Sequence, residues 1–327
     1  MRGVKFNFFV DLIIVSLVFA YAFFIVFQFD HEVAKVISLD APEIGVQDET
    51  IIKVMTYNIA HGRGHLSMYE KSAFGRNFNI KSEEELTRRL DKIAELVREN
   101  NIDILVLEEV DFDASWSYNV DQAMYLANKA GFSNVVEGFK WSVDVPFLKI
   151  KAGNAILSNY PIMYASNTKF RSESFWRRFV GGHSFLDVTY LINGKPLRIL
   201  ATHLDSDSDV ARVAEAEEMV EVVASSKYPV LIAGDLNTVT PLTKKVNEKM
   251  RNKFTDSTLE TFINSGLFEF NEKLLRPNDD DMFTYSAEDP HRIIDFIFTT
   301  PEVEITEYYV VQEDLSDHYP LTARIIV

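Results

Sequence analysis

From residue 51 to residue 327, short runs of β-branched and other apolar residues alternate with segments of helical periodicity. Runs of this length, bounded by turn residues, are typical of buried strands. The predicted strands cover residues 51–58, 102–110, 154–158, 184–192, 196–204, 229–237, 292–298 and 320–327. Because the strands come in pairs and threes between single helices, we expect an α/β sandwich with mixed sheets rather than a strict βαβ repeat.

Two of the intervening helices carry clear signals of their own. The first begins at Ser82, where Glu85 three residues later completes a capping box. The second covers about residues 208–225 and has apolar residues at helical spacing. The sequence contains no G-x-G-x-x-G, Walker A or G-x-S-x-G motif, which argues against dinucleotide binding, P-loop chemistry and a serine hydrolase.

A separate apolar segment stands at the N-terminus. Residues 12–27 carry no charge, and the wider stretch 8–29 would be roughly 33 Å long as a helix, enough to span a bilayer core. Arg2 and Lys5 precede this stretch, so the positive-inside rule keeps the N-terminus in the cytoplasm and places the remaining chain outside. We therefore expect an uncleaved transmembrane anchor over residues 1–30, with secretion after signal cleavage as the alternative.

The rest of the chain is expected to form a tether over residues 31–50 and one domain over residues 51–327. The chain has 33 Lys and Arg against 49 Asp and Glu, a net charge of −16. This charge repels a long polyanion and argues against nonspecific coating of nucleic acid. The absence of cysteine excludes thiolate metal sites and a cysteine nucleophile.

Polar side chains stand at or near the ends of several predicted strands. They are Asn58, Glu108, Glu109, His203, Asp235, Asn237, Asp295, Asp317 and His318. In an open α/β sheet, such positions are the usual place for a site. Oxygen donors without cysteine suit a hard cation such as Mg²⁺, with Mn²⁺ or Ca²⁺ as alternatives. Each residue alone also fits a turn, a cap or a solvated strand end, so the argument depends on their order along the chain.

Seven motifs occur in the order found in the endonuclease/exonuclease/phosphatase superfamily, the DNase I-like proteins. They are TYNIAHG (56–62), LVLEEVD (105–111), GNAILSNYPI (153–162), ATHLD (201–205), LIAGDLNT (231–238), RIIDFIF (292–298) and SDHYPL (316–321). The chain resembles this superfamily over essentially all of 51–327, and most closely its secreted or membrane-anchored bacterial members. The resemblance implies a four-layer α/β sandwich of two mixed sheets flanked by helices, preceded here by the transmembrane helix. It also implies a metal-dependent phosphoric ester hydrolase.

The resemblance assigns roles to individual residues. Asn58 and Glu109 are implied to form the metal site, with Glu109 as the direct ligand. Asp235 would orient or deprotonate the attacking water, and Asn237 would hold that water and the phosphoryl oxygens.

Further roles concern the phosphate. His203 and His318 are implied to contact the scissile phosphate, one of them as general acid. Asp317 would fix the tautomer of His318, and Asp295 would support the hydrogen-bond network on the phosphate side.

Three residues are expected to support the site from behind: Glu108, Asn154 and His61. The superfamily usually has Gln before the metal-binding Glu, whereas this chain has Glu108. An extra carboxylate would strengthen cation binding, raise the pKa of a neighbour or change the preferred metal.

Two segments differ from the acidic background because they mix cations with aromatic residues: FKWSVDVPFLKIK (139–151) and KFRSESFWRRFV (169–180). They predict a rim that meets a membrane interface or binds an anionic head group. Base stacking in a nuclease and plain packing on the sandwich are the alternatives.

Together these observations favour an extracytoplasmic, Mg²⁺-dependent phosphodiesterase that acts on phospholipid or small-molecule head groups by in-line attack of water. The alternatives are an extracellular nuclease and a catalytically inactive, membrane-tethered phospholipid-binding module. The expected partners are the membrane and a phosphate-ester substrate, with no obligate protein partner.

Overall fold

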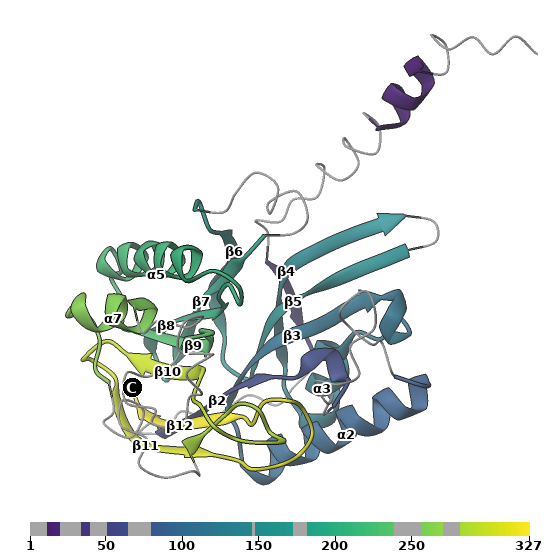
Figure 1. The fold of residues 1–327 in the computed structure, drawn as a ribbon. Helices are drawn as coiled ribbons and strands as arrows, with labels where there is room; N and C mark the ends of the chain where they lie inside the picture. The colour runs from purple at the N-terminus through teal and green to yellow at the C-terminus, as the bar shows by residue number, and fades with distance from the viewer. Residues whose placement is uncertain are drawn as a thin grey trace, which may run out of the picture.

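Two mixed β-sheets face each other, and helices cover their outer faces (Figure 1). The computed structural model describes residues 12–19, 34–39, 51–64, 80–145, 148–172, 182–238, 257–270 and 282–327. The expected α/β class with two mixed sheets is confirmed.

The larger sheet has seven strands in the order β1-β4-β5-β3-β2-β12-β11. Their bounds are β1 (Lys35–Ser38), β2 (Ile51–Asn58), β3 (Ile104–Ala114), β4 (Asn134–Val145), β5 (Leu148–Ser158), β11 (Glu304–Val310) and β12 (Leu321–Ile326). In this sheet β2 and β3 run parallel, and the other neighbouring strands pair antiparallel.

The smaller sheet has five strands in the order β10-β9-β8-β7-β6. Their bounds are β6 (Ile162–Lys169), β7 (Ser184–Ile192), β8 (Lys195–His203), β9 (Val230–Asp235) and β10 (Asp295–Thr299). Here β8 and β9 run parallel, and the other neighbouring strands pair antiparallel.

Helices lie on both sides of the pair of sheets. On one side, α2 (Glu83–Glu99) and α3 (Gln122–Ala130) pack on the outer face of the seven-stranded sheet. On the other side, α5 (Asp209–Ala224) and α7 (Ser257–Asn264) cover the five-stranded sheet (Figure 1). The described part of the chain is thus layered as helices, sheet, sheet and helices.

Both helices predicted from the sequence are present, and a serine side chain caps the start of each. At the start of α2, Ser82 Oγ accepts a hydrogen bond from the Glu85 N–H at 3.1 Å. At the start of α5, Ser208 Oγ accepts one from the Ala211 N–H at 3.3 Å. These side chains satisfy backbone donors that have no partner within the first turn of a helix.

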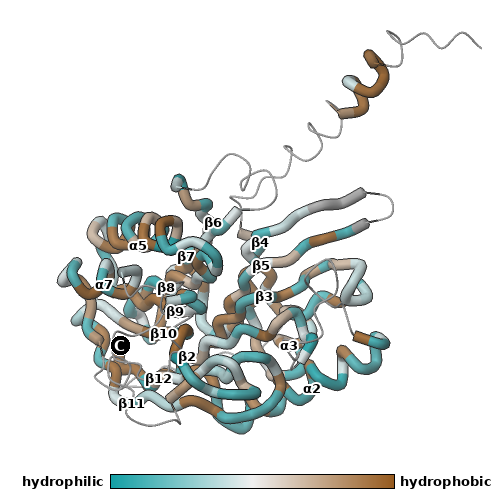
Figure 2. Tube along the Cα trace, in the orientation of Figure 1, coloured by the Kyte–Doolittle hydropathy of each residue, from teal (hydrophilic) through white to brown (hydrophobic). Residues whose placement is uncertain are grey.

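Apolar clusters fill the spaces between the layers. One cluster lies between α2, α3 and the seven-stranded sheet, and another lies between the sheets and extends to α5 and α7. Alternate residues of β3 belong to different clusters. Leu105 and Leu107 pack against the helices α2 and α3, whereas Ile104 and Val106 face the five-stranded sheet. Hydrophobic residues are accordingly concentrated on the central strands (Figure 2).

The two parallel strand pairs, β2 with β3 and β8 with β9, place polar side chains next to one another. Asn58 at the end of β2 lies opposite Glu108 of β3, and His203 at the end of β8 lies opposite Asp235 at the end of β9. The antiparallel β10 adds Asp295, opposite Asp235 on its other side. Because the carboxyl ends of parallel strands meet at the same edge of a sheet, each pair contributes neighbouring polar groups.

The predicted anchor lies largely outside the described residues. Residues 12–19 are helical and almost wholly hydrophobic (Figure 2), and the structure does not describe the rest of residues 1–30. Among the described residues, no helix combines the length and the apolar character needed to cross a bilayer.

Part of the expected tether over residues 31–50 is instead a strand, because residues 35–38 form β1 at the edge of the larger sheet. Lys35 explains the attachment, since its Nζ lies 2.9 Å from Oε2 of the buried Glu137 on β4. Burial, followed by the charge of Asp121, raises the pKa of Glu137 to about 7, and Lys35 opposes that rise. The ion pair and the antiparallel pairing with β4 together hold this short segment in the sheet.

The close approach of β8 and β9 at Gly234 can be tested by stability measurements. Gly234 has a φ of 147°, and a Cβ at this position would clash with the carbonyl oxygen of Thr202. Gly131 also has a positive φ, 88°, but a Cβ there would meet nothing within 4 Å. Gly234→Ala is expected to lower the free energy of unfolding by about 2 kcal/mol more than Gly131→Ala, measured by urea unfolding. Equal losses in the two variants would contradict the close contact.

Candidate active site

A cavity of about 350 Å³ opens beside the ends of β2, β8 and β9. The predicted residues in its lining are Asn58, His61, Glu109, Asn154, His203, Asp235, Asn237, Asp317 and His318. The other two predicted residues, Glu108 and Asp295, are buried behind the lining. The structure therefore brings residues from distant motifs into one site.

Asn58 connects the two sheets at this cavity. Its Nδ2 donates a hydrogen bond to Oδ2 of Asp235 at 3.1 Å, from one sheet to the other. Its Oδ1 accepts one from the Ala60 N–H at 3.0 Å, and its backbone carbonyl accepts one from the Ser316 hydroxyl at 2.7 Å. An amide oxygen has two lone pairs, so Oδ1 can still bind a cation.

His318 is held by Asp295. The ring Nδ1 lies 2.9 Å from Oδ2 of Asp295 on β10. The expectation that Asp317 fixes the tautomer of His318 is therefore wrong. Side chains of successive residues point in different directions, and Asp317 contributes to the cavity lining instead. Asp295 thus supports the site through the imidazole.

The two imidazoles of the cavity have opposite charge preferences. Burial, followed by the cation of Lys140, holds the pKa of His203 well below its usual value. Burial also disfavours the imidazolium of His318, but Asp295 and Asp235 outweigh it and raise the pKa of His318 to about 10. At neutral pH, His203 is therefore a neutral imidazole and His318 an imidazolium.

Asp235 lies between these two rings. Its Oδ2 is 3.7 Å from Nε2 of His203 and also 3.7 Å from Nε2 of His318. Its Oδ1 accepts a hydrogen bond from the Asn237 N–H at 2.9 Å. Burial, then the charge of Asp295, raises the pKa of Asp235 to about 7. A carboxyl group that titrates near neutral pH is suited to exchange a proton with a bound water.

Three residues of the cavity lining other than glycine have left-handed backbone conformations. His61 has a φ of 56°, Glu109 a φ of 52° and Asn237 a φ of 50°. Such conformations cost about 1 kcal/mol or more for residues other than glycine, and they are concentrated at functional sites. Asn237 is also fixed by its Nδ2, which donates to the Leu204 carbonyl at 3.0 Å.

Glu108 takes no part in the cavity lining. Its Oε1 accepts a hydrogen bond from the Thr56 hydroxyl at 2.7 Å, and its side chain is buried. Burial, then the charge of Asp295, raises the pKa of Glu108 well above its usual value. Burial therefore favours the uncharged form of this acid, and its side chain does not place an extra carboxylate ligand in the cavity lining.

The donors on the β2 and β3 side of the cavity fit a hard divalent cation. Asn58 offers an amide oxygen and Glu109 a carboxylate, and both line the cavity. Mg²⁺ usually binds only one or two protein carboxylates, and water and substrate fill its other positions. Ligand atoms of Asp235, Asp295 and His318 also lie within 4.8 Å of one another, but Nδ1 of His318 is engaged by Asp295.

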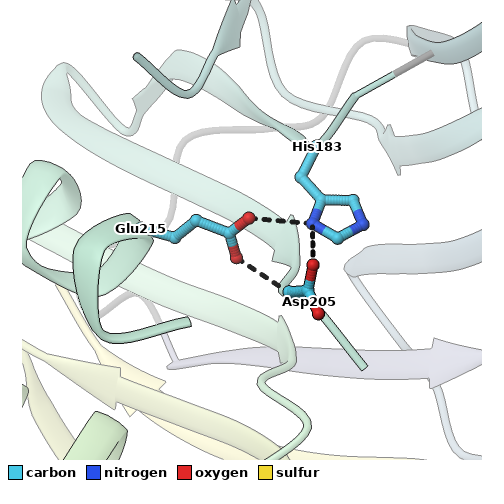
Figure 3. Close-up of side chains that lie close together, drawn as sticks. All are labelled: His183, Asp205 and Glu215. Carbon is cyan, nitrogen blue, oxygen red and sulfur yellow. Dashed lines mark hydrogen bonds and ion pairs between the residues drawn. The ribbon is translucent and has the colours of Figure 1, made fainter. Parts of the chain in front are cut away.

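A second buried cluster adjoins this site (Figure 3). Nδ1 of His183 lies 2.8 Å from Oε1 of Glu215 and 3.8 Å from Oδ2 of Asp205. Glu215 also accepts a hydrogen bond from the Asp205 N–H at 2.9 Å. Because Asp205 follows His203 by two residues, these contacts tie the end of β8 to α5 and fix the backbone that carries His203.

Tyr285 and Arg292 are cavity residues that the motifs do not predict as site residues. Cζ of Arg292 lies 4.4 Å from the centre of the Tyr285 ring, and this ring lies 4.8 Å from that of His318. The sequence offered a signal for Arg292 alone: it is the first residue of the motif RIIDFIF, three residues before Asp295.

The two segments predicted to form a rim differ in their contacts. Lys140 and Trp141, from the segment 139–151, line the cavity. In the segment 169–180, Phe170 is buried against Phe185, as the packing alternative expects. Residues 173–180 of that segment lie outside the described part of the chain.

The charge state of His318 can be measured directly by NMR of the imidazole nitrogens in the metal-free protein. His318 is expected to remain protonated at about pH 8, whereas His203 is expected to be neutral at about pH 6. The folded state binds this proton of His318 more tightly than the unfolded state. Its contribution to stability is therefore complete below pH 6.5 and is lost as the pH rises through about 10.

Two variants complete this test. Asp295→Asn is expected to lower the pKa of His318. Asp187→Asn removes a carboxylate on β7 that pairs with Arg198 on β8, and it is expected to leave the pKa of His318 unchanged. Resonances are assigned from His203→Gln and His318→Gln. A pKa of His318 that is unaltered by Asp295→Asn would refute the role of Asp295.

Comparison with known proteins gives the site its context. No curated protein matches the sequence. An endonuclease/exonuclease/phosphatase from Beutenbergia cavernae has a similar structure, with a TM-score of 0.61 and 20% identity over 84% of this chain and 71% of that chain. The mannosyl-6-phosphatase of Bacteroides thetaiotaomicron has a TM-score of 0.57 and 15% identity, over 84% of this chain and 100% of that chain. At these identities the likeness shows the fold.

The human nocturnin catalytic domain, solved with a sulfate anion, is similar at a TM-score of 0.57 and 19% identity, over 92% of this chain and 97% of that chain. The model of the endonuclease/exonuclease/phosphatase family matches residues 55–318, an interval that begins in β2 and ends at His318. The interval contains all the residues that line the cavity. The chain therefore belongs to the endonuclease/exonuclease/phosphatase family, whose members hydrolyse phosphoric esters.

Proposed function

We propose that this protein is a membrane-anchored, Mg²⁺-dependent phosphodiesterase that hydrolyses phospholipid or small-molecule head groups outside the cytoplasm. Residues 1–30 form the anchor, residues 31–50 link it to the catalytic domain and contribute β1 to the larger sheet, and residues 51–327 form the catalytic domain. The apolar, uncharged run within residues 12–27 and the basic residues before it support the anchor and its orientation.

One observation carries the enzymatic part of the proposal. Asp235 lies between a neutral and a cationic imidazole, in a cavity that also contains the donors of Asn58 and Glu109. A proton acceptor, a fixed cation and a set of oxygen donors are the groups that hydrolysis of a phosphoric ester by water requires. The same groups argue against a module that only binds phospholipid.

Asp235 acts on the attacking water. In its ionised form, the carboxylate accepts a proton from a water that attacks phosphorus in line with the leaving oxygen. Asn237 presents its Oδ1 to this water, because its Nδ2 is bound to the Leu204 carbonyl. No covalent intermediate with the protein is needed.

His318 acts on the phosphate. Nδ1 donates to Asp295, so the Nε2–H of the imidazolium is available to stabilise charge on the phosphoryl or leaving oxygen. The neutral His203 contributes hydrogen bonding without repelling His318. Asn58 and Glu109 would hold a divalent cation, which would supply Lewis-acid stabilisation of charge on the phosphoryl oxygens.

The β4 side of the cavity supports a small charged substrate with an apolar part. Lys140 and Trp141 lie in the lining together with His203, so an anionic group and an apolar surface can be accommodated next to the scissile ester. The net charge of −16 disfavours a long polyanion at the same surface.

Asp235→Asn is expected to lower turnover by about 100-fold or more, because the variant keeps the shape of the side chain but loses the proton acceptor. Turnover is measured on bis(4-nitrophenyl) phosphate at saturating Mg²⁺, and circular dichroism checks the fold. Asp187→Asn is the matched control, because it also removes a buried carboxylate but lies outside the cavity lining. Unchanged turnover in Asp235→Asn would refute the assigned mechanism.

A substrate panel tests the choice of ester. The full-length protein in detergent is expected to release product from sphingomyelin-type or glycerophospholipid head groups in a chelator-sensitive reaction. Inositol phosphate, mannose 6-phosphate and single- and double-stranded DNA are run in parallel. Trp141→Ala is expected to raise KM for the lipid more than for bis(4-nitrophenyl) phosphate. Chelator-sensitive turnover of DNA alone would replace the lipid proposal by an extracellular nuclease.

A further inference from the structure

The loop after β2 turns His61 back toward the cavity through an unusual backbone path. Ala60 and His61 have φ values of 47° and 56°, and Gly62 has a φ of 70°. The His61 carbonyl accepts a hydrogen bond from Nε2 of Gln122 on α3 at 2.9 Å. The left-handed backbone of Ala60 and His61 costs conformational energy, whereas Gly62 adopts it freely, so the fold maintains the position of the imidazole at a cost.

A buried carboxylate orients the ring. Nδ1 of His61 lies 2.7 Å from Oδ1 of Asp111, which is fully buried on β3. The other oxygen of Asp111 accepts a hydrogen bond from Nε1 of Trp116 at 2.8 Å, and its backbone N–H donates to Oε1 of Gln122 at 3.1 Å. Because the carboxylate is an acceptor, Nδ1 donates its proton to Asp111, and Nε2 is the ring nitrogen that is left to face another partner.

The remaining ring nitrogen faces the predicted metal ligand. Nε2 of His61 lies 3.4 Å from Oε2 of Glu109, and both residues line the cavity. Two ligand atoms bound to one cation at about 2.1 Å are separated by about 3 Å at angles of 90–110°. A small movement of either side chain therefore allows both atoms to bind the same ion.

We propose that His61 is a nitrogen ligand of the divalent cation held by Asn58 and Glu109. The inference rests on the proposed function, because it concerns the cation of that same site. Metal-binding histidines usually donate their other ring nitrogen to a carboxylate or carbonyl, which is the arrangement of His61 on Asp111. Mixed nitrogen and oxygen ligation favours Mn²⁺ over Mg²⁺, because imidazole binds transition metals better than hard cations.

The direct test uses Mn²⁺ bound to the full-length protein in detergent at less than one equivalent. Pulsed electron paramagnetic resonance detects coupling between Mn²⁺ and a directly bound ¹⁴N nucleus. The wild type is expected to show this coupling, and His61→Gln is expected to lose it. His183→Gln is the matched control, because His183 is also a buried imidazole beside carboxylates but lies outside the cavity lining (Figure 3). This control is expected to keep the coupling.

A second measurement tests the orienting role of Asp111. Isothermal titration is expected to show that Asp111→Asn weakens Mn²⁺ binding by about 10- to 100-fold, the usual effect of losing the partner of a metal-binding histidine. The loss of Mg²⁺ affinity is expected to be smaller. Equal losses for the two ions would overturn the nitrogen ligand, because a general distortion of the site weakens both.

The outcomes separate this inference from the proposed function. If Mn²⁺ binds and supports turnover but the wild type shows no ¹⁴N coupling, His61 is not a ligand and the phosphodiesterase proposal stands. Coupling that persists in His61→Gln also refutes the inference. If neither Mn²⁺ nor Mg²⁺ binds to the wild type, the proposed metal-dependent function fails together with the inference.

Discussion

The site depends on a buried ion pair that joins the two sheets, the contact between His318 and Asp295. His318 precedes β12 of the larger sheet, whereas Asp295 begins β10 of the smaller one, and the two charged groups lie 2.9 Å apart. Removing one partner of a buried pair leaves an uncompensated charge and typically costs about 3–5 kcal/mol. The Asn58–Asp235 hydrogen bond crosses the same interface. The geometry of the site therefore depends on how the two sheets pack against each other.

This ion pair also sets the protonation of the neighbouring groups. With Asp295 engaged, His318 is cationic, while burial keeps His203 neutral. Asp235 lies between them with a pKa raised to about 7, so the cavity contains both a proton acceptor, Asp235, and a cationic group, the imidazolium of His318. Behind them, burial raises the pKa of Glu108 well above its usual value, which opposes a further negative charge in the buried region. Membership of the endonuclease/exonuclease/phosphatase family agrees with a site in which positioning and electrostatics perform the chemistry.

The sequence predicted the central strands, because buried β-branched runs are local patterns, and the order of its motifs indicated most of the polar residues that line the cavity. β1 was not predicted, since a four-residue strand is held by a partner, Glu137, that is remote in the chain. The sequence motifs also did not predict which carboxylate pairs with which imidazole, because the partners come from different motifs. Asp317 is adjacent to His318 in sequence, yet Asp295 binds it, and His61 contacts Asp111 through a left-handed turn that no residue pattern revealed.

The central claim is that side chains from both sheets act as one catalytic unit. A double-mutant cycle tests it most directly, with kcat measured for Asp235→Asn, His318→Gln and the double variant on one phosphodiester at saturating cation. Groups that act together are strongly non-additive, so the double variant is expected to retain a kcat within about tenfold of the slower single variant. If the two losses multiply instead, Asp235 and His318 act independently, and a single catalytic unit across the sheets is contradicted.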